Sequence, residues 1–217
     1  EQLRFDRPLT AGILRLGVPI ALQDVLVGVS FLVILAIVNS LGLLQSAGMG
    51  IAEKVCAFVM LLPSAFSQSV SAFVAQNTGA AKPDRAKKAL RYSVVSVFVF
   101  YFNFFHGDLL AGIFANDRAV ILEAADYLKA YAIDCLLTSF LFCFVGYFSG
   151  LGKTVFVMAQ GILGAFGVRI PVSFFMSRLP NVRLFYIGLA TPCSTVVQVL
   201  LCLAYYAHLG RREKAGP

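Results

Sequence analysis

Three charged side chains of this 217-residue chain lie inside long apolar stretches, where a charge is costly. Asp24, preceded by Gln23, lies about two turns into the first stretch. Asp134 lies in the fourth stretch and Arg169 in the fifth. A charge at the centre of a bilayer costs at least about 2.5–3.5 kcal/mol, and residues that carry one commonly bind ions or substrate. Asp24 is the strongest candidate to bind a proton or Na⁺, because Pro19 can loosen the helix before it.

Each of these residues also has a purely structural interpretation. Asp24 and Asp134 could take part only in a hydrogen bond between helices, or in a salt bridge with Arg169. Glu53 and Lys54 begin the second apolar stretch. They suit a buried role and the outer membrane interface about equally well, since long charged side chains reach water from there.

A stripe of polar residues at helical spacing follows Pro63 in the second apolar stretch. It consists of Ser64, Ser67, Gln68 and Ser71. Small polar residues on one helix face usually indicate close helix packing, which is the favoured interpretation. The same face could line a water-filled cavity, and the sequence leaves that alternative open.

Several chemistries are disfavoured by the spacing of reactive residues. The five cysteines include no CxxC pair, and the two histidines lie far apart, so neither a disulfide framework nor a metal site is expected. Ser149 lacks the glycine that a serine-nucleophile loop needs two residues earlier. The run from Gly150 to Thr154 lacks the first glycine of a phosphate-binding loop. We therefore expect no enzyme activity and no cofactor, and either transport driven by an ion gradient or a passive structural role.

The elements that position these residues are six apolar stretches. The chain is 59% apolar and 13% charged, about half the charge of a soluble domain. A helix needs about 20 residues to cross the hydrocarbon core. The stretches that reach this length are 16–38, 55–75, 92–112, 127–148, 155–176 and 184–206. The sequence predicts an all-α integral membrane protein with six transmembrane helices.

Lysine and arginine predict how these helices are oriented. One set of connecting segments carries Arg4, Arg7, Arg15, Lys82, Arg85, Lys87, Lys88, Arg91, Lys153, Arg211, Arg212 and Lys214. The opposite segments carry Arg118, Arg178 and Arg183. The basic side is expected to be cytoplasmic, which places both termini there. The net charge of +7 then indicates anionic membrane lipids as partners, and no nucleic acid. Asp126 and Lys129 are expected to form a solvated pair.

Three segments follow from this organisation. Residues 1–15 are predicted to be an amphipathic cytoplasmic connector, residues 16–207 a six-helix transmembrane lobe, and residues 208–217 a basic cytoplasmic tail. The chain begins with Glu1 rather than methionine, and we expect it to start partway through a longer protein.

Motifs along the chain resemble the MATE (multidrug and toxic compound extrusion) transporters over about residues 15–207. The most specific is the run 73–80, FVAQNTGA, which continues to Arg85 and resembles a cytoplasmic loop of the family. The residues that carry this likeness are Gln76, Asn77, Gly79 and Arg85. Residues 17–23, 37–42, 146–152, 169–171 and 188–192 resemble other family segments, in the family's order. Residues 146–152 correspond to a short glycine-rich loop.

The resemblance implies a twelve-helix antiporter built from two six-helix lobes, of which this chain is the carboxyl-terminal one. Such a protein exports drugs or cationic and amphipathic metabolites across the plasma membrane in exchange for H⁺ or Na⁺. Its partner would be the missing amino-terminal lobe or a second copy of this chain. Some members place coupling carboxylates in the two helices where Asp24 and Asp134 lie.

Two other functions remain open. A lipid or lipid-linked sugar flippase of the same superfamily would need a cavity rich in arginine and lysine, and this lobe offers mainly Arg169. A membrane protein that only assembles with partners is the other alternative.

Overall fold

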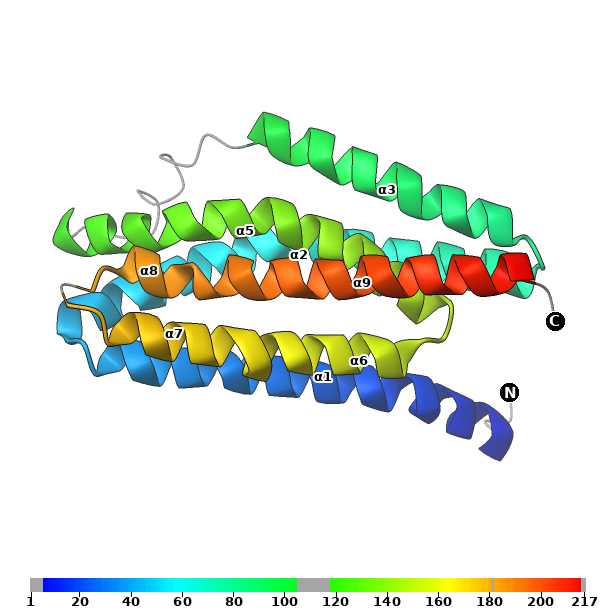
Figure 1. Cartoon of the computed structure of the whole chain (residues 1–217), viewed down its shortest axis with the longest axis horizontal. Helices are drawn as coiled ribbons and strands as arrows, with labels where there is room; N and C mark the ends of the chain where they lie inside the picture. The colour runs from blue at the N-terminus through cyan, green and yellow to red at the C-terminus, as the bar shows by residue number, and fades with distance from the viewer. Residues whose placement is uncertain (1–5, 105–117, 181, 216–217) are drawn as a thin grey trace, which may run out of the picture.

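A computed structural model of the chain describes residues 6–104, 118–180 and 182–215, all of it helices and short turns. The helices run side by side along the long axis of the molecule (Figure 1). Their bounds are α1 Arg7–Asn39, α2 Leu43–Gly79, α3 Pro83–Phe104, α5 Arg118–Gly150, α6 Thr154–Ile162, η1 Leu163–Arg169, α7 Ile170–Ser177, α8 Leu184–Gly188 and α9 Ala190–Ala215.

The all-α membrane architecture is confirmed. Within the described residues, five helical segments are long and apolar enough to cross a bilayer. They are Arg7–Asn39, Leu43–Gly79, Ile133–Gly150, Thr154–Ser177 and Leu184–Arg212. The predicted stretch 92–112 overlaps α3, but its second half lies outside the described residues. The sixth span therefore stays a prediction.

Two helices begin earlier than hydropathy alone indicates. The α1 helix starts at Arg7, so the predicted connector shares a helix with the first span. Asp6 caps it, since its Oδ1 accepts a hydrogen bond from the Leu9 amide at 3.1 Å. The α2 helix starts at Leu43, and Glu53 and Lys54 lie almost three turns inside it. Their predicted position at the start of that element was wrong, because hydropathy marks the apolar centre of a helix and not its ends.

One span contains a wide turn. The π-helical segment η1 joins α6 to α7 without a break and ends at Arg169, two residues before Pro171. Proline cannot donate the next helical hydrogen bond, and its ring clashes with the carbonyl one turn earlier. A local widening of the helix relieves that clash, and such π-turns often occur at functional positions.

The α2 and α5 helices cross at close range through two glycines. A Cβ atom at Gly146 would collide with the carbonyl oxygen of Ser67, and one at Gly150 would lie 2.6 Å from that of Ser71. Small residues allow this backbone contact between membrane helices. Gly146 lies inside α5, which ends at Gly150. Of the predicted loop 146–152, only the residues after Gly150 form a turn. Gly146 and Gly150 belong to α5, where they allow it to pack against α2.

Both helical ends of the chain lie on one side. In Figure 1 the start of α1 and the end of α9 are at the same end of the bundle as the turns α2–α3 and α5–α6. We call this the basic end, since most of the lysines and arginines of the connecting segments lie there.

The opposite end is held by an ion pair that the sequence did not predict. Asp126 Oδ1 lies 2.8 Å from Arg183 Nη2 and 3.8 Å from Lys129 Nζ. The Asp126 side chain is only 12% exposed, and its Oδ2 accepts from the Phe185 amide at 3.4 Å. The expected pair of Asp126 with Lys129 is present, but the expectation that it is solvated was wrong for Asp126, because folding brings the segment before α8 against α5.

The glycine contact between α2 and α5 can be tested with alanine. We expect Gly146→Ala to lower the stability of the detergent-purified chain by about 1–3 kcal/mol, because the new methyl group meets rigid backbone. Thermal unfolding followed by size-exclusion chromatography measures the change. Gly50→Ala in α2 is the matched control, since nothing lies within 4 Å of a Cβ there. Equal midpoints for the two variants would contradict this account of the packing.

Candidate functional site

A cavity of about 600 Å³ lies inside the bundle, lined by residues of α1, α2, α5, α6, η1 and α9. Its wall carries amides, hydroxyls and two charged groups among apolar residues. A mostly apolar hollow with a few convergent polar groups is the usual form of a small-molecule site.

The structure brings most of the predicted site residues together on this wall. Gln23 and Asp24 come from α1, Ser67 and Gln68 from α2, and Arg169 from η1. These residues lie up to about 145 positions apart in sequence, so the fold alone collects them. Ser64 and Ser71 of the predicted stripe also line the cavity. The same stripe packs closely on α5, so both interpretations of it hold.

Asp24 lies where the cavity opens. It lines the cavity and is itself exposed, while the neighbouring Gln23 is half-buried. In the part of the chain that the structure describes, its carboxylate has no hydrogen-bond or ion-pair partner. A carboxylate in this position is accessible to a cation that enters the cavity.

Asp134 lies behind the wall and is only 2% exposed. Its Oδ2 accepts a hydrogen bond from Thr138 Oγ1 at 2.9 Å, and its Oδ1 accepts one from Thr195 Oγ1 at 2.6 Å. Both threonines line the cavity. This carboxyl group therefore ties α5 to α9 and is separated from the cavity by two hydroxyls.

Arg169 is a buried cation with few partners. It is 6% exposed, and its Nη1 donates to Ser30 Oγ at 3.3 Å. Its guanidinium lies over the ring of Phe31, 4.5 Å from the centroid, which is cation–π geometry. Among the described residues no carboxylate oxygen lies within ion-pair distance of Arg169. The structure does not show the alternative salt bridge with Asp24 or Asp134.

Several polar atoms at the cavity have no hydrogen-bond partner among the residues that the structure describes. Gln23 Oε1, both amide atoms of Gln160 and Arg169 Nε are buried without a hydrogen bond. A buried unsatisfied polar atom costs about 1–3 kcal/mol, so such atoms are rare in native proteins. Their concentration at one cavity indicates that water, an ion or a substrate completes the site.

Sequence reasoning missed Gln160, Thr138, Thr195 and Gln198. Gln160 is 3% exposed on α6, and Gln198 is 5% exposed on α9. Gly164 leaves room for Gln198, and Gly161 leaves room for Gln23, whose Cδ would lie 2.8 Å from an added Cβ. A polar residue next to a glycine inside an apolar helix is the signal that could have found Gln160, which precedes Gly161. Gln198 has no such neighbour in sequence, and only the fold brings it to Gly164.

The family-motif residues lie elsewhere. Gln76, Asn77 and Gly79 end α2, and Arg85 lies in the first turn of α3, all at the basic end. Asn77 Nδ2 donates to the Phe73 carbonyl at 2.8 Å, and the Lys82 amide donates to the Asn77 carbonyl at 2.8 Å. The motif therefore closes the turn between two helices and lines no part of the cavity.

Comparison with known proteins gives a consistent picture. The family model described as MatE matches residues 19–175, well over half of the chain. The chain is 24% identical to "Probable multidrug resistance protein YoeA" of Bacillus subtilis over 98% of this chain and 47% of that protein. It is 28% identical to "Multidrug export protein MepA" of Staphylococcus saprophyticus over 82% of this chain and 40% of that protein.

Solved structures share the fold. One of them is described as an outward-facing conformation of a multidrug resistance MATE family transporter of the MOP superfamily. It superposes with a TM-score of 0.81 at 21% identity, and the match covers 92% of this chain and 45% of that one. A MATE complex with MaL6 gives 0.87 at 13% identity, over 97% and 49%. The chain spans about half the length of the relatives it matches.

The cavity predicts a difference in thiol labelling between two serines of α2. With the native cysteines replaced, we expect Ser64→Cys to react with a membrane-impermeant cationic methanethiosulfonate, since Ser64 lines the cavity. Ser69→Cys is the control, because Ser69 is exposed on the helix surface and bonds only to the Ala65 carbonyl. Its thiol would face lipid, where the reactive thiolate hardly forms, so its rate should be lower on the order of tenfold or more. Equal rates would show that water does not fill the cavity.

Proposed function

The chain belongs to the MatE family, and from this premise we propose that it forms the carboxyl-terminal lobe of a secondary active antiporter. The transporter exports drugs or cationic and amphipathic metabolites across the plasma membrane in exchange for H⁺ or Na⁺. The observation that carries this proposal is the polar cavity within the membrane-spanning helices, with Asp24 at its opening.

Asp24 is the proposed binding residue for the coupling ion, supported by the amide of Gln23. The position suits the role because the carboxylate has no competing partner among the described residues and faces the cavity. A proton would neutralise it, and Na⁺ would be held by carboxylate and amide oxygens, the ligands that hard cations prefer. Either ion removes a negative charge from the place where a cationic substrate would bind.

Ion binding would then change the relative stability of two arrangements of the lobe. The cavity wall joins helices through few polar contacts, among them Thr195 to Asp134 and Arg169 to Ser30. A change of charge at Asp24 would act on these contacts electrostatically across the cavity. A ligand shifts such an equilibrium only if it binds one of the two states more tightly than the other. In the proposed transporter, this difference in affinity depends on the charge at Asp24.

The proposed transporter needs a second lobe. The chain spans about half of each matched relative, and the partner would be an amino-terminal lobe or a second copy of this chain. The lysines and arginines of the basic end support a cytoplasmic position for it, and both ends of the lobe would then lie in the cytoplasm.

The polarity of the cavity favours an amphipathic or cationic substrate over a lipid phosphate. Arg169 is the one cation among the lining residues, which all belong to the described part of the chain, and it lines the same cavity as Asp24. Phosphate binding usually relies on several arginines and lysines. A flippase is therefore the less supported alternative.

The proposal is tested by neutralising Asp24 in the transporter with both lobes present. We expect Asp24→Asn to reduce gradient-driven efflux of a lipophilic cationic dye from proteoliposomes to the level of empty vesicles, because the residue can no longer exchange a charge. The dye is followed by fluorescence under an imposed pH gradient and, separately, an imposed Na⁺ gradient. The gradient that drives the unsubstituted protein identifies the coupling ion.

Asp84→Asn serves as the control, since Asp84 is an exposed carboxylate in the first turn of α3 and away from the cavity. It removes the same charge and should leave efflux unchanged. Unchanged efflux in Asp24→Asn would remove Asp24 from the mechanism. Absence of dye movement in the unsubstituted protein under both gradients would reject the proposed antiport of this substrate class.

A further inference from the structure

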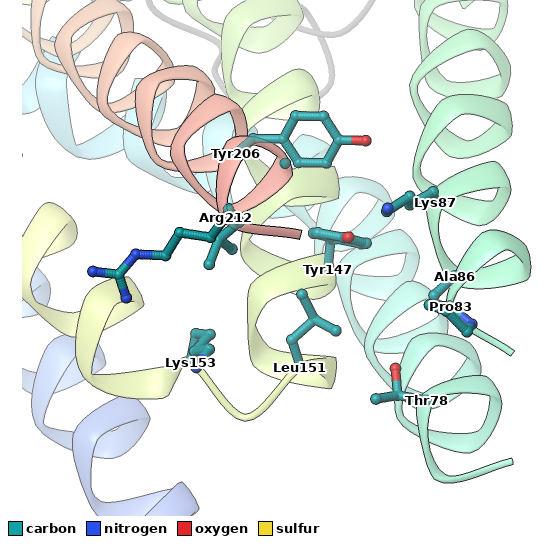
Figure 2. Close-up of a pocket in the computed structure, with 11 residues that line it drawn as sticks. Thr78, Pro83, Ala86, Lys87, Tyr147, Leu151, Lys153, Tyr206 and Arg212 are labelled. Carbon is teal, nitrogen blue, oxygen red and sulfur yellow. The ribbon is translucent and has the colours of Figure 1, made fainter. Parts of the chain in front are cut away.

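A second hollow, of about 360 Å³, lies at the basic end and is separate from the polar cavity. It forms a groove between α3 and α9, over the last turns of α5 (Figure 2). We call it the basic-end groove and define it by Ala86, Lys87, Tyr147, Lys153, Tyr206 and Arg212. It has no residue in common with the cavity wall.

The inner surface of the groove is apolar and aromatic. Tyr147 of α5 and Leu151 in the turn after it line the groove, with Pro83 and Ala86 on the α3 side. Tyr147 is 4% exposed, and its ring meets the Tyr206 ring edge-on with centroids 5.7 Å apart. This aromatic packing gives the groove a firm wall that suits glycerol and the first methylenes of an acyl chain.

Three cations from three different segments surround this apolar surface. Lys87 comes from α3 and is half-buried, whereas Lys153, in the α5–α6 turn, and Arg212, on α9, are exposed. Figure 2 shows the Lys87 amine on the side of Tyr147 and Tyr206, with Arg212 extending away on the other side near Lys153. The lining residues, all of them described, include no aspartate or glutamate. Lys153 and Arg212 therefore give the exposed side of the groove a positive charge that attracts anions.

The groove is also expected at the depth of lipid headgroups. The candidate membrane span that contains α9 runs from Leu184 to Arg212 and has 29 residues. A helix crosses the hydrocarbon core with about 20 residues, so we expect the Arg212 end of this span to lie beyond the core. Lys153 lies in the turn that follows α5. At this depth a lipid presents its phosphate and glycerol, which match the cations and the apolar wall.

We propose that the basic-end groove binds the headgroup of an anionic phospholipid, with its phosphate between the exposed cations Lys153 and Arg212. Basic pockets between transmembrane helices are known to select anionic headgroups in this way. The hydroxyl of Tyr206 supplies a neutral donor beside the phosphate. Occupancy would hold α3 and α9 together across α5, and it depends neither on Asp24 nor on the transported substrate.

Native mass spectrometry of the detergent-purified chain tests this site with defined lipids. Phosphatidylglycerol is titrated against phosphatidylcholine with the same acyl chains, and against glycerol phosphate, which has no acyl chains. We expect phosphatidylglycerol to bind at least about tenfold more tightly than either, because only this lipid combines a net negative headgroup with acyl chains. Equal binding of glycerol phosphate would show a site for free anions and overturn the assignment to lipid.

Two variants of the groove test whether the lipid binds at this site. Lys153→Gln together with Arg212→Gln should weaken phosphatidylglycerol binding roughly tenfold or more, and both residues are exposed, so the fold should tolerate the change. Tyr206→Phe keeps the ring packing and removes one donor, so a smaller loss is expected. The matched control is Lys82→Gln with Lys88→Gln, two exposed lysines at the same end that do not line the groove. Equal losses in the two double variants would show general surface attraction and reject the site.

Discussion

The hydrocarbon interior of a membrane offers no hydrogen-bond partners, and this constraint shapes the centre of the bundle. Every polar group there must be satisfied by the protein or by water that the protein admits. Asp134 meets the requirement through two threonine hydroxyls, and Arg169 meets it in part through Ser30 and the face of Phe31. Gln160 does not meet it within the protein. The cavity is therefore the physical consequence of placing these groups in the membrane, because its contents complete what the helices leave unsatisfied.

The helices hold this cavity open by packing very closely next to it. Gly146 and Gly150 allow α5 to contact the backbone of α2, and Gly161 and Gly164 make room for glutamines on α1 and α9. Membrane helices associate through such close packing, since burial from lipid gives no hydrophobic gain. The backbone of Ser67 contacts α5, and Ser67 also lines the cavity. One polar stripe can therefore both pack against a helix and line a cavity.

Hydropathy predicted the membrane class and the apolar centres of the described spans, because both depend on local composition. It did not predict the start of α1, which depends on the Asp6 cap within a charged segment, nor that of α2. The pairing of Asp126 with Arg183 joins residues 57 positions apart, and no local pattern encodes it. The rule that ionisable residues in spans are functional candidates selected Asp24 and Arg169, which the fold places on one wall, and Gln23 was included only as the neighbour of Asp24. The rule missed Gln160 and Gln198, because a neutral amide in an apolar helix gives a weaker signal than a charge.

The two carboxylates of the site are not equivalent, although the sequence presents them alike. Asp134 is enclosed and already accepts two hydroxyl hydrogen bonds, so a cation reaching it would have to displace Thr138 or Thr195. Asp24 is exposed at the opening and has no partner to displace among the described residues. Asp134 is therefore suited to hold α5 against α9, and Asp24 to exchange an ion. Arg169 reaches the same wall from the π-turn before Pro171, so the cavity's cation lies where its helix departs from regular α-helical geometry. Such departures are frequent at functional sites, which supports a role for this wall in the proposed transport.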